Sequence, residues 1–227
     1  MNNLVSPSIA SGNHTWQTTI SKSKSFNGIG LHSGNLIKVN LKPGKENTGI
    51  IFVRSDIDKK IRERSIQALY SNVSDTSLCT TIENEYGIKV STIEHLMAAF
   101  NGTGIDNIII ELNGPEVPIM DGSSLPFIEI IEDCGIQSLK VKRKILKILK
   151  KIEVTVDNKS CSFTPSKDQK FSVEIDFENE AVGKQSASTS LTNYNFKKFA
   201  SNARTFGFMK DVEYMRSQGL GLGGSID

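Results

Sequence analysis

The clearest hydrophobic pattern in the chain lies between residues 91 and 100. Apolar residues recur there with the i, i+3, i+4, i+7 spacing that places them on one buried face of a helix: Ile93, Leu96, Met97 and Phe100. Asn101-Gly102 follows this run, and such a pair is typical of a helix C-terminal cap. The pattern therefore predicts a helix that begins near residue 91 and ends at Asn101-Gly102.

Runs of apolar and β-branched residues predict strands on both sides of this helix, at 16–26, 36–41, 50–53 and 107–112. A second amphipathic helix is predicted over 125–134, where Gly135 ends it. Strands followed by a helix, a strand and a helix indicate an α+β domain over residues 16–137. The polar stretch 1–15 in front of it is expected to be a disordered extension.

The second half of the chain starts again with strands, predicted at 145–156, 160–164 and 171–177. The polar stretch 178–192 is predicted to be a loop. Two helices follow, over 194–200 and over 209–218, and Gly219 ends the second one. Because both halves place strands before helices, we predict a second α+β domain over 138–227 with a topology similar to the first.

Composition narrows the class of protein. The 227 residues are 37% hydrophobic and 23% charged, as in ordinary globular proteins, and the net charge of +2 gives no basic footprint for nucleic acid. Cys79, Cys134 and Cys161 are widely spaced and odd in number, which favours reduced thiols in a reducing compartment. No stretch approaches the roughly 20 apolar residues of a membrane span, and the N-terminus lacks a secretory signal. We expect a soluble, cytoplasmic protein.

Glu94 and His95 stand side by side at the start of the predicted helix, and two interpretations are open. In the structural one, Ser91 and Glu94 form a capping box and His95 is a surface or satisfied core histidine. In the catalytic one, His95 binds a metal and Glu94 is the general base for a metal-bound water. The motif H-E-x-x-H is absent, since Ile93 precedes Glu94 and Ala99 stands four residues after His95. This helix therefore supplies one ligand, and others must come from elsewhere.

Two glycine-rich stretches need separate interpretations. Residues 28–34 read Gly-Ile-Gly-Leu-His-Ser-Gly, which fits either a hairpin connection with an exposed His32 or a loop that lets a ligand approach the backbone. Residues 219–224 satisfy G-x-G-x-x-G as text. We reject a dinucleotide site there, because the stretch follows a helix and opens none.

Taken together, several segments resemble one family, the UDP-3-O-acyl-N-acetylglucosamine deacetylases, which are zinc amidases of lipid A biosynthesis. They occur in the family's order from about Trp16 to the last residue, and this collinearity makes the resemblance specific. The matching segments are 28–34, 76–80 (Thr-Ser-Leu-Cys-Thr), 91–96 (Ser-Thr-Ile-Glu-His-Leu), 104–108, 118–123 (Pro-Ile-Met-Asp-Gly-Ser), 203–208 (Ala-Arg-Thr-Phe-Gly-Phe) and 219–227.

The resemblance implies a role for three residues in hydrolysis of the N-acetyl amide. His95 matches a zinc ligand, and Glu94 matches the general base that deprotonates the zinc-bound water. Thr205 matches a threonine that polarises the scissile carbonyl and stabilises the oxyanion; without the family it is a β-branched strand residue. Iron(II) would suit the same histidine and carboxylate ligands.

Substrate contacts are also implied by the resemblance. Asp176 and Phe177 match a pair at the uridine site, where the aromatic ring stacks on the base. The other matches line the substrate site and a hydrophobic passage for the fatty acyl chain: Leu31 near its mouth, Cys79, Phe206, Met209, Val212 and Gly221. The implied fold is two α+β domains of similar topology, with their helices packed together between the two sheets. We expect the substrate to be a small molecule and the protein to be a monomer.

The chain departs from the family at its remaining zinc ligands. The family takes them from an H-K-x-x-D motif, which this sequence lacks; its only histidines are His14, His32 and His95. A catalytic zinc ion usually has three protein ligands and one open position. We therefore expect the C-terminally truncated part of such an enzyme, with an incomplete second domain. The alternative function is a catalytically incompetent module that binds only the UDP-sugar or the acyl chain.

Overall fold

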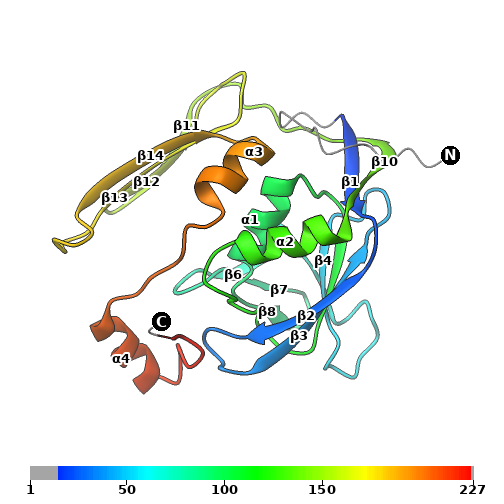
Figure 1. Cartoon of the computed structure of the whole chain (residues 1–227), viewed down its shortest axis with the longest axis horizontal. Coiled ribbons are helices and arrows are strands. Elements are labelled where there is room, and N and C mark those ends of the chain that lie inside the picture. Colours follow the sequence, from blue (N-terminus) through cyan, green and yellow to red (C-terminus); the bar gives the residue numbers. More distant parts are fainter. Residues whose placement is uncertain (1–14, 226–227) are drawn as a thin grey trace.

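The computed structural model describes residues 15–225, so the predicted extension lies outside the described residues except for Thr15. The chain is a mixed α and β structure, as predicted, with several small sheets and helices packed against them (Figure 1). Within the described residues, no helix is long and apolar enough to cross a membrane.

A five-stranded sheet forms the base of the first half, in the order β2-β3-β9-β4-β5. Its strands are β2 (Lys24–Ile29), β3 (Leu36–Pro43), β9 (Ile108–Leu112), β4 (Ile50–Arg54) and β5 (Ser65–Gln67). Strands β4 and β9 are parallel, and the other neighbours are antiparallel. In β3 and β9 alternate side chains are buried, as expected for a sheet with one covered face.

Helices α1 (Glu94–Thr103) and α2 (Leu125–Cys134) cover that face. The predicted apolar stripe of α1 is confirmed, because Ile93, Leu96 and Phe100 are buried and Met97 packs against the same core. Beside the sheet lie the 3-10 turn η1 (Tyr70–Asn72) and a three-stranded sheet of β6 (Val73–Asp75), β7 (Thr81–Glu83) and β8 (Lys89–Val90). These elements give the first half one continuous core.

Two predicted boundaries in the first half are wrong. The strand expected over 16–26 is broken, because Ser21 donates its N–H to the carbonyl of Gly135 (2.9 Å) and β1 (Trp16–Ile20) pairs with β10 (Ile136–Lys142) instead of continuing into β2. Helix α1 runs past Asn101-Gly102 to Thr103, and the next residue, Gly104, ends it with a φ of +78°.

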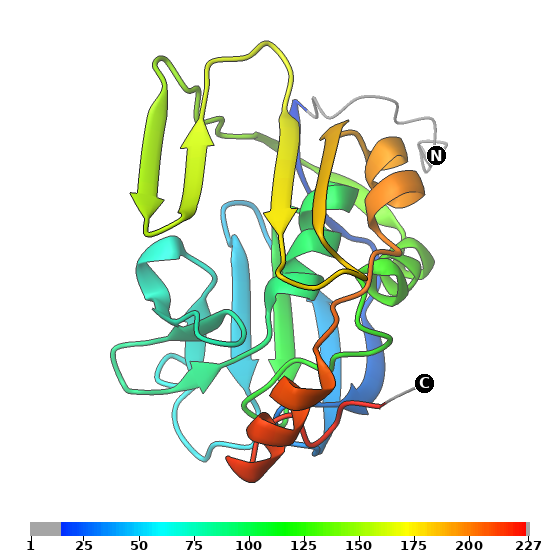
Figure 2. The same cartoon turned by 90° about the vertical axis from the view of Figure 1, so that its left-hand side faces the viewer.

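The second half contains two antiparallel hairpins, formed by β11 (Ile152–Val156) with β12 (Lys159–Phe163) and by β13 (Lys170–Asp176) with β14 (Lys184–Ser190). Figure 2 shows them next to each other above the five-stranded sheet, and in Figure 1 helices α1 and α2 lie between. The predicted loop over 178–192 is wrong, since β14 lies within it. The predicted strand over 145–156 is shorter, starting at Ile152.

The chain then forms a short helical unit, α3 (Asn193–Asn195) and the π-helical turn η2 (Phe196–Ala200), before α4 (Met209–Ser217). Both predicted helices of the second half are thus confirmed in position. The division of the chain at residue 137 stays a prediction, and β10 runs across it.

Candidate functional site

The first turn of α1 carries the Glu94-His95 pair, and its geometry is not that of a capping box. Ile93 occupies the N-cap position, and no side chain caps this helix. Instead, the backbone N–H of Thr80 donates to Oε2 of Glu94 (3.0 Å), while the Ser91 hydroxyl accepts from Thr81 Oγ1 (3.0 Å). The predicted box is therefore wrong, and the Glu94 carboxylate is held toward the loop at 76–80.

His95 and Glu94 are both partly exposed, unlike the core residues on the opposite side of α1. A partly exposed imidazole beside a carboxylate fits the chemistry of one metal ligand and one base. Within residues 15–225, however, no group of three or more His, Cys, Asp or Glu side chains is placed to hold a metal ion. The described residues therefore do not by themselves complete a three-ligand zinc site.

The loop at 76–80 brings Cys79 to this place. Cys79 precedes Thr80, the residue whose N–H binds Glu94, and its Sγ lies 3.7 Å from Thr81 Oγ1. At the start of the loop, Asp75 Oδ1 accepts hydrogen bonds from the hydroxyl (2.7 Å) and the N–H (3.0 Å) of Ser77. These bonds lower the pKa of the Asp75 carboxyl. The structure thus places Cys79 and Glu94 at one loop, with His95 next to Glu94 on α1.

Thr205 is fixed through its backbone. Its N–H donates to the carbonyl of Gly122 (2.8 Å), and the neighbouring Arg204 donates from Nε to the carbonyl of Asp121 (2.6 Å). The Thr205 side chain is exposed, and in the described part of the chain its hydroxyl forms no hydrogen bond with Glu94 or His95. Thr205 therefore stands on a segment anchored to the loop in front of α2, and no hydrogen bond among the described residues joins its side chain to the Glu94-His95 pair.

The predicted acyl-chain residues fall on α4 and on the segments beside it. Met209 and Val212 lie one turn apart on α4; Met209 is exposed and Val212 is half-buried. Gly221 is buried, with a φ of +66°, and the segment after it binds the loop at 30–34, where the Gly223 N–H donates to the Leu31 carbonyl (2.9 Å). Leu31 is thereby next to the C-terminal part of the predicted lining.

Asp176 ends β13, and Phe177 follows it in an aromatic cluster. The Phe177 ring contacts the rings of Phe206 and Phe208 edge-to-face, with centroids 5.6 and 5.9 Å away. An open cavity of about 310 Å³ adjoins this cluster, lined by Phe177, Glu178, Asn179, Phe208, Lys210 and Asp211. The residues matched to the uridine site and to the acyl passage, Phe177 and Phe206, are therefore direct neighbours here.

The environment of His32 differs from one expectation, and a second residue, Glu116, had not been expected at the site. Both ring nitrogens of His32 are buried and have no hydrogen-bond partner in the described part of the chain, so the interpretation of an exposed His32 is wrong. Glu116 is 3% exposed and accepts hydrogen bonds from the loop at 30–34. The available signal was a carboxylate directly after Gly114-Pro115, just beyond the predicted strand at 107–112.

The chain is similar to proteins of one known family over almost its whole length. Residues 17–227 match the family described as UDP-3-O-acyl N-acetylglycosamine deacetylase (LpxC). Curated relatives named UDP-3-O-acyl-N-acetylglucosamine deacetylase are 44% identical in Pasteurella multocida, 44% in Histophilus somni and 42% in Haemophilus influenzae (strain 86-028NP). Each alignment spans 214 residues, which are 93% of this chain and 69% of the relative.

Proposed function

This chain belongs to the UDP-3-O-acyl N-acetylglycosamine deacetylase family of hydrolases, and we propose that it hydrolyses the acetamide of a UDP-3-O-acyl-N-acetylglucosamine and releases acetate, a step of lipid A biosynthesis. The observation that carries the proposal is the Glu94-His95 pair. It sits on the first turn of α1 with both side chains partly exposed, and the Glu94 carboxylate is oriented by the N–H of Thr80.

The proposed reaction uses Glu94 as a base. Its carboxylate accepts a proton from water while the water oxygen attacks the acetyl carbonyl carbon. Thr205 donates a hydrogen bond to the carbonyl oxygen, where negative charge develops. The C–N bond then breaks, the sugar nitrogen takes up a proton, and the acetyl group leaves as acetate. Anchoring of the Thr205 backbone to Gly122 supports this role, because a fixed donor needs little reorganisation.

We further propose His95 as one ligand of a zinc ion. Bound there, zinc would supply a Lewis acid for the carbonyl and lower the pKa of a water; iron(II) suits the same donors. Residues 15–225 offer no group of three ligands, so the remaining donors to such an ion would lie outside the groups that these residues form.

The substrate's two ends have separate candidate contacts. The acyl chain is assigned to Met209 and Val212 on α4, with Leu31 and Gly221 beside them. Stacking on the uracil ring is assigned to Phe177, next to Asp176. Cys79 lies one residue from the N–H that binds Glu94, so it is proposed to contact the substrate near the reacting amide.

Glu94→Gln tests the proposed base. The amide can still accept from the Thr80 N–H, but it cannot take the proton, so acetate release should fall roughly 10²- to 10⁴-fold. Glu129→Gln, an exposed glutamate of α2, is the control and should keep full turnover. If the Glu94 variant turns over as fast as the control, Glu94 is not the base, and only its hydrogen bond to Thr80 remains as its role.

Binding without turnover is the second candidate function, favoured by the lack of a three-ligand group within residues 15–225. Calorimetric titration of substrate, acetate release and metal content by mass spectrometry separate the two. Binding with no acetate release and no retained zinc supports the binding module. Acetate release that rises with zinc content supports the deacetylase.

A further inference from the structure

Glu116 is a buried carboxylate that joins two parts of the candidate site. It is 3% exposed, and each of its oxygens accepts from the loop at 30–34: Oε1 from the His32 N–H (2.8 Å) and Oε2 from the Ser33 N–H (2.9 Å). Oε1 also accepts from the hydroxyl of Thr92 (3.0 Å), two residues before Glu94. A buried charge needs such donors, and these three are its only partners among the described residues.

The loop is built to let this carboxylate approach. A Cβ at Gly30 would lie 2.5 Å from Glu116 Oε2 and 2.4 Å from Ser33 Oγ, so only glycine fits there. On its other side the loop receives the C-terminal segment, because the Gly223 N–H donates to the Leu31 carbonyl and a Cβ at Gly223 would lie 2.2 Å from the Gly30 carbonyl oxygen. The loop is thus held between Glu116 and the segment that follows α4.

Thr92 makes the second half of the link. Its φ is +57°, a left-handed conformation that a β-branched residue rarely adopts and that persists only when neighbouring contacts hold it. Its hydroxyl bond to Glu116 is one such contact. Two backbone bonds of the preceding residue, Ser91, to the residues that flank Glu116 are others: the Ser91 N–H donates to the Pro115 carbonyl (2.8 Å), and the Val117 N–H donates to the Ser91 carbonyl (3.0 Å).

We propose that Glu116 is a positioning residue that sets the loop at 30–34 and the first turn of α1 in one fixed relation. The loop carries Leu31, assigned to the acyl chain, and the first turn carries Glu94 and His95. Glu116 touches none of the reacting atoms; it acts by fixing the distance between the acyl contact and the base. The assignment of these two roles rests on the proposed function.

Glu116→Gln tests this link between the loop and α1. The amide NH₂ replaces one carboxylate oxygen, so that a buried N–H of the loop faces a donor in place of an acceptor. For a long-acyl substrate, kcat/KM should fall by up to roughly 100-fold, because a buried N–H without an acceptor shifts the loop and a small misplacement of the substrate costs about that factor. An analogue whose 3-O-acyl group is too short to reach the mouth of the passage at Leu31 should lose several-fold less. Glu116→Asp keeps the charge and both acceptors and should restore part of the selectivity.

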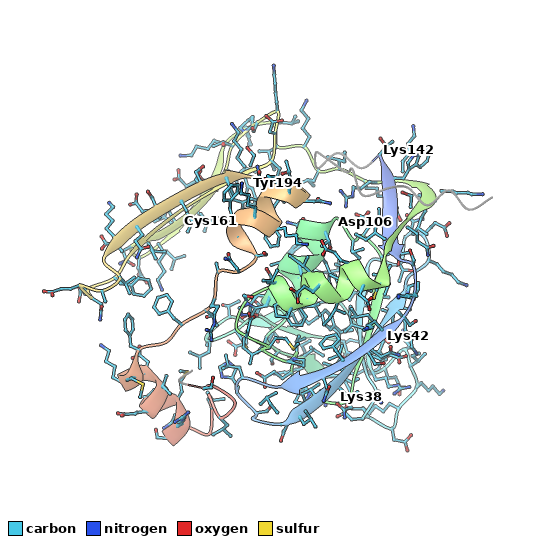
Figure 3. All side chains as sticks on the ribbon, viewed as in Figure 1. Lys38, Lys42, Asp106, Lys142, Cys161 and Tyr194 are labelled. Atoms are coloured by element: carbon cyan, nitrogen blue, oxygen red, sulfur yellow. The ribbon has the colours of Figure 1, made fainter. Side chains whose placement is uncertain are left out.

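Asp106→Asn is the matched control. Asp106, labelled in Figure 3, follows the other end of α1. Its carboxylate also accepts from three donors: the N–H (2.9 Å) and the hydroxyl (3.4 Å) of Thr18 and Nε of Arg143 (2.6 Å). It should lower stability but leave the ratio of long- to short-acyl kcat/KM unchanged. If Glu116→Gln lowers both substrates equally, as Asp106→Asn does, Glu116 is only structural and the proposal fails.

Amide hydrogen exchange gives a readout that needs no activity. Gly223 N–H, bonded to Leu31, and Met97 N–H, bonded to the Ile93 carbonyl (2.9 Å), do not touch Glu116. Both should exchange faster in Glu116→Gln than in Asp106→Asn, while core amides of β9 change equally in the two variants. An unchanged rate at either reporter overturns the link, even if the wild-type protein releases no acetate and the proposed function itself fails.

Thr92→Val provides the same test if Glu116→Gln does not fold. It removes one of the three bonds to Glu116 while keeping the shape and backbone preference of a β-branched residue. Thr92→Ser retains the hydroxyl and is its control. The valine variant should show faster exchange at Gly223, on the far side of the loop, and the serine variant should not; equal rates in the two variants contradict the proposal.

Discussion

Substitution of Gly102 tests how the two halves of the chain are joined. Gly102 is a buried residue in the last turn of α1, and a Cβ there would lie 2.1 Å from Cδ1, 2.4 Å from Cε1 and 2.7 Å from Cγ of Phe196 in η2. All three separations are far below van der Waals contact, so Gly102→Ala forces the ring to move. Phe196 is half-buried and packs against the core of the first half.

Two opposing free energies decide the outcome. Overpacking costs about 1–3 kcal/mol, whereas replacing glycine by alanine within a helix stabilises by about 1 kcal/mol. We therefore expect Gly102→Ala to lower the free energy of unfolding by up to about 2 kcal/mol. In a Phe196→Ala background the ring is gone, so the same change should stabilise by up to about 1 kcal/mol.

The assay is urea unfolding of the four proteins of the double-mutant cycle, with the m-value checked to be constant. Asn101→Ala, at the exposed neighbouring position of α1, is the control and should have the same effect in both backgrounds. If Gly102→Ala shifts the free energy of unfolding by the same amount with and without the Phe196 ring, the close contact between α1 and η2 does not exist in solution.

Two further predictions follow from the site and its surroundings. Val212→Trp should narrow the proposed passage beside α4 and penalise long-acyl substrates most, because each buried methylene contributes about 0.8 kcal/mol; equal loss for short and long chains, measured as kcat/KM, would contradict it. Arg54 donates two hydrogen bonds to Asp56 (2.9 and 2.7 Å) and lowers the pKa of that carboxyl. This stabilisation is complete above the unfolded pKa of about 3.9 and is lost as the pH falls through the lower folded pKa. Asp56→Asn should therefore make the free energy of unfolding fall less steeply as the pH is lowered. An unchanged dependence of the free energy of unfolding on pH below about pH 4 contradicts the prediction.

Where a local pattern determined the structure, the sequence was sufficient. The buried face of α1 follows from apolar spacing, because a helix repeats every 3.6 residues whatever it packs against. Strands β3, β4 and β9 were predicted within a few residues for the same kind of reason, since their apolar residues fill one covered sheet face.

Strand β14 shows why other elements were missed. Its sequence, Lys-Gln-Ser-Ala-Ser-Thr-Ser, has no apolar alternation, and its residues are exposed or half-buried. What makes it a strand is the seven-residue antiparallel pairing with β13, from Lys170 opposite Ser190 to Asp176 opposite Lys184. Backbone pairing of this kind leaves no trace in side-chain hydrophobicity. The capping box failed similarly, because Glu94 found a donor in Thr80, on a different segment.

The same distinction applies within the candidate site. Glu94 and His95 were visible in the sequence, but the partners around them are remote. Thr80, which binds Glu94, precedes it by 14 positions, and Glu116, which binds Thr92, follows Thr92 by 24. Such partners form only when the sheet, the loop at 30–34 and α1 are assembled together. Hydrolysis at a fixed carbonyl requires that base and acyl contact keep their separation. Under the proposal for Glu116, that separation depends on this one buried carboxylate and on Gly30, which allows its approach. Substitutions at Glu116 or Gly30 should therefore change the selectivity for acyl-chain length, while the proposed reacting groups, Glu94 and Thr205, stay in the protein.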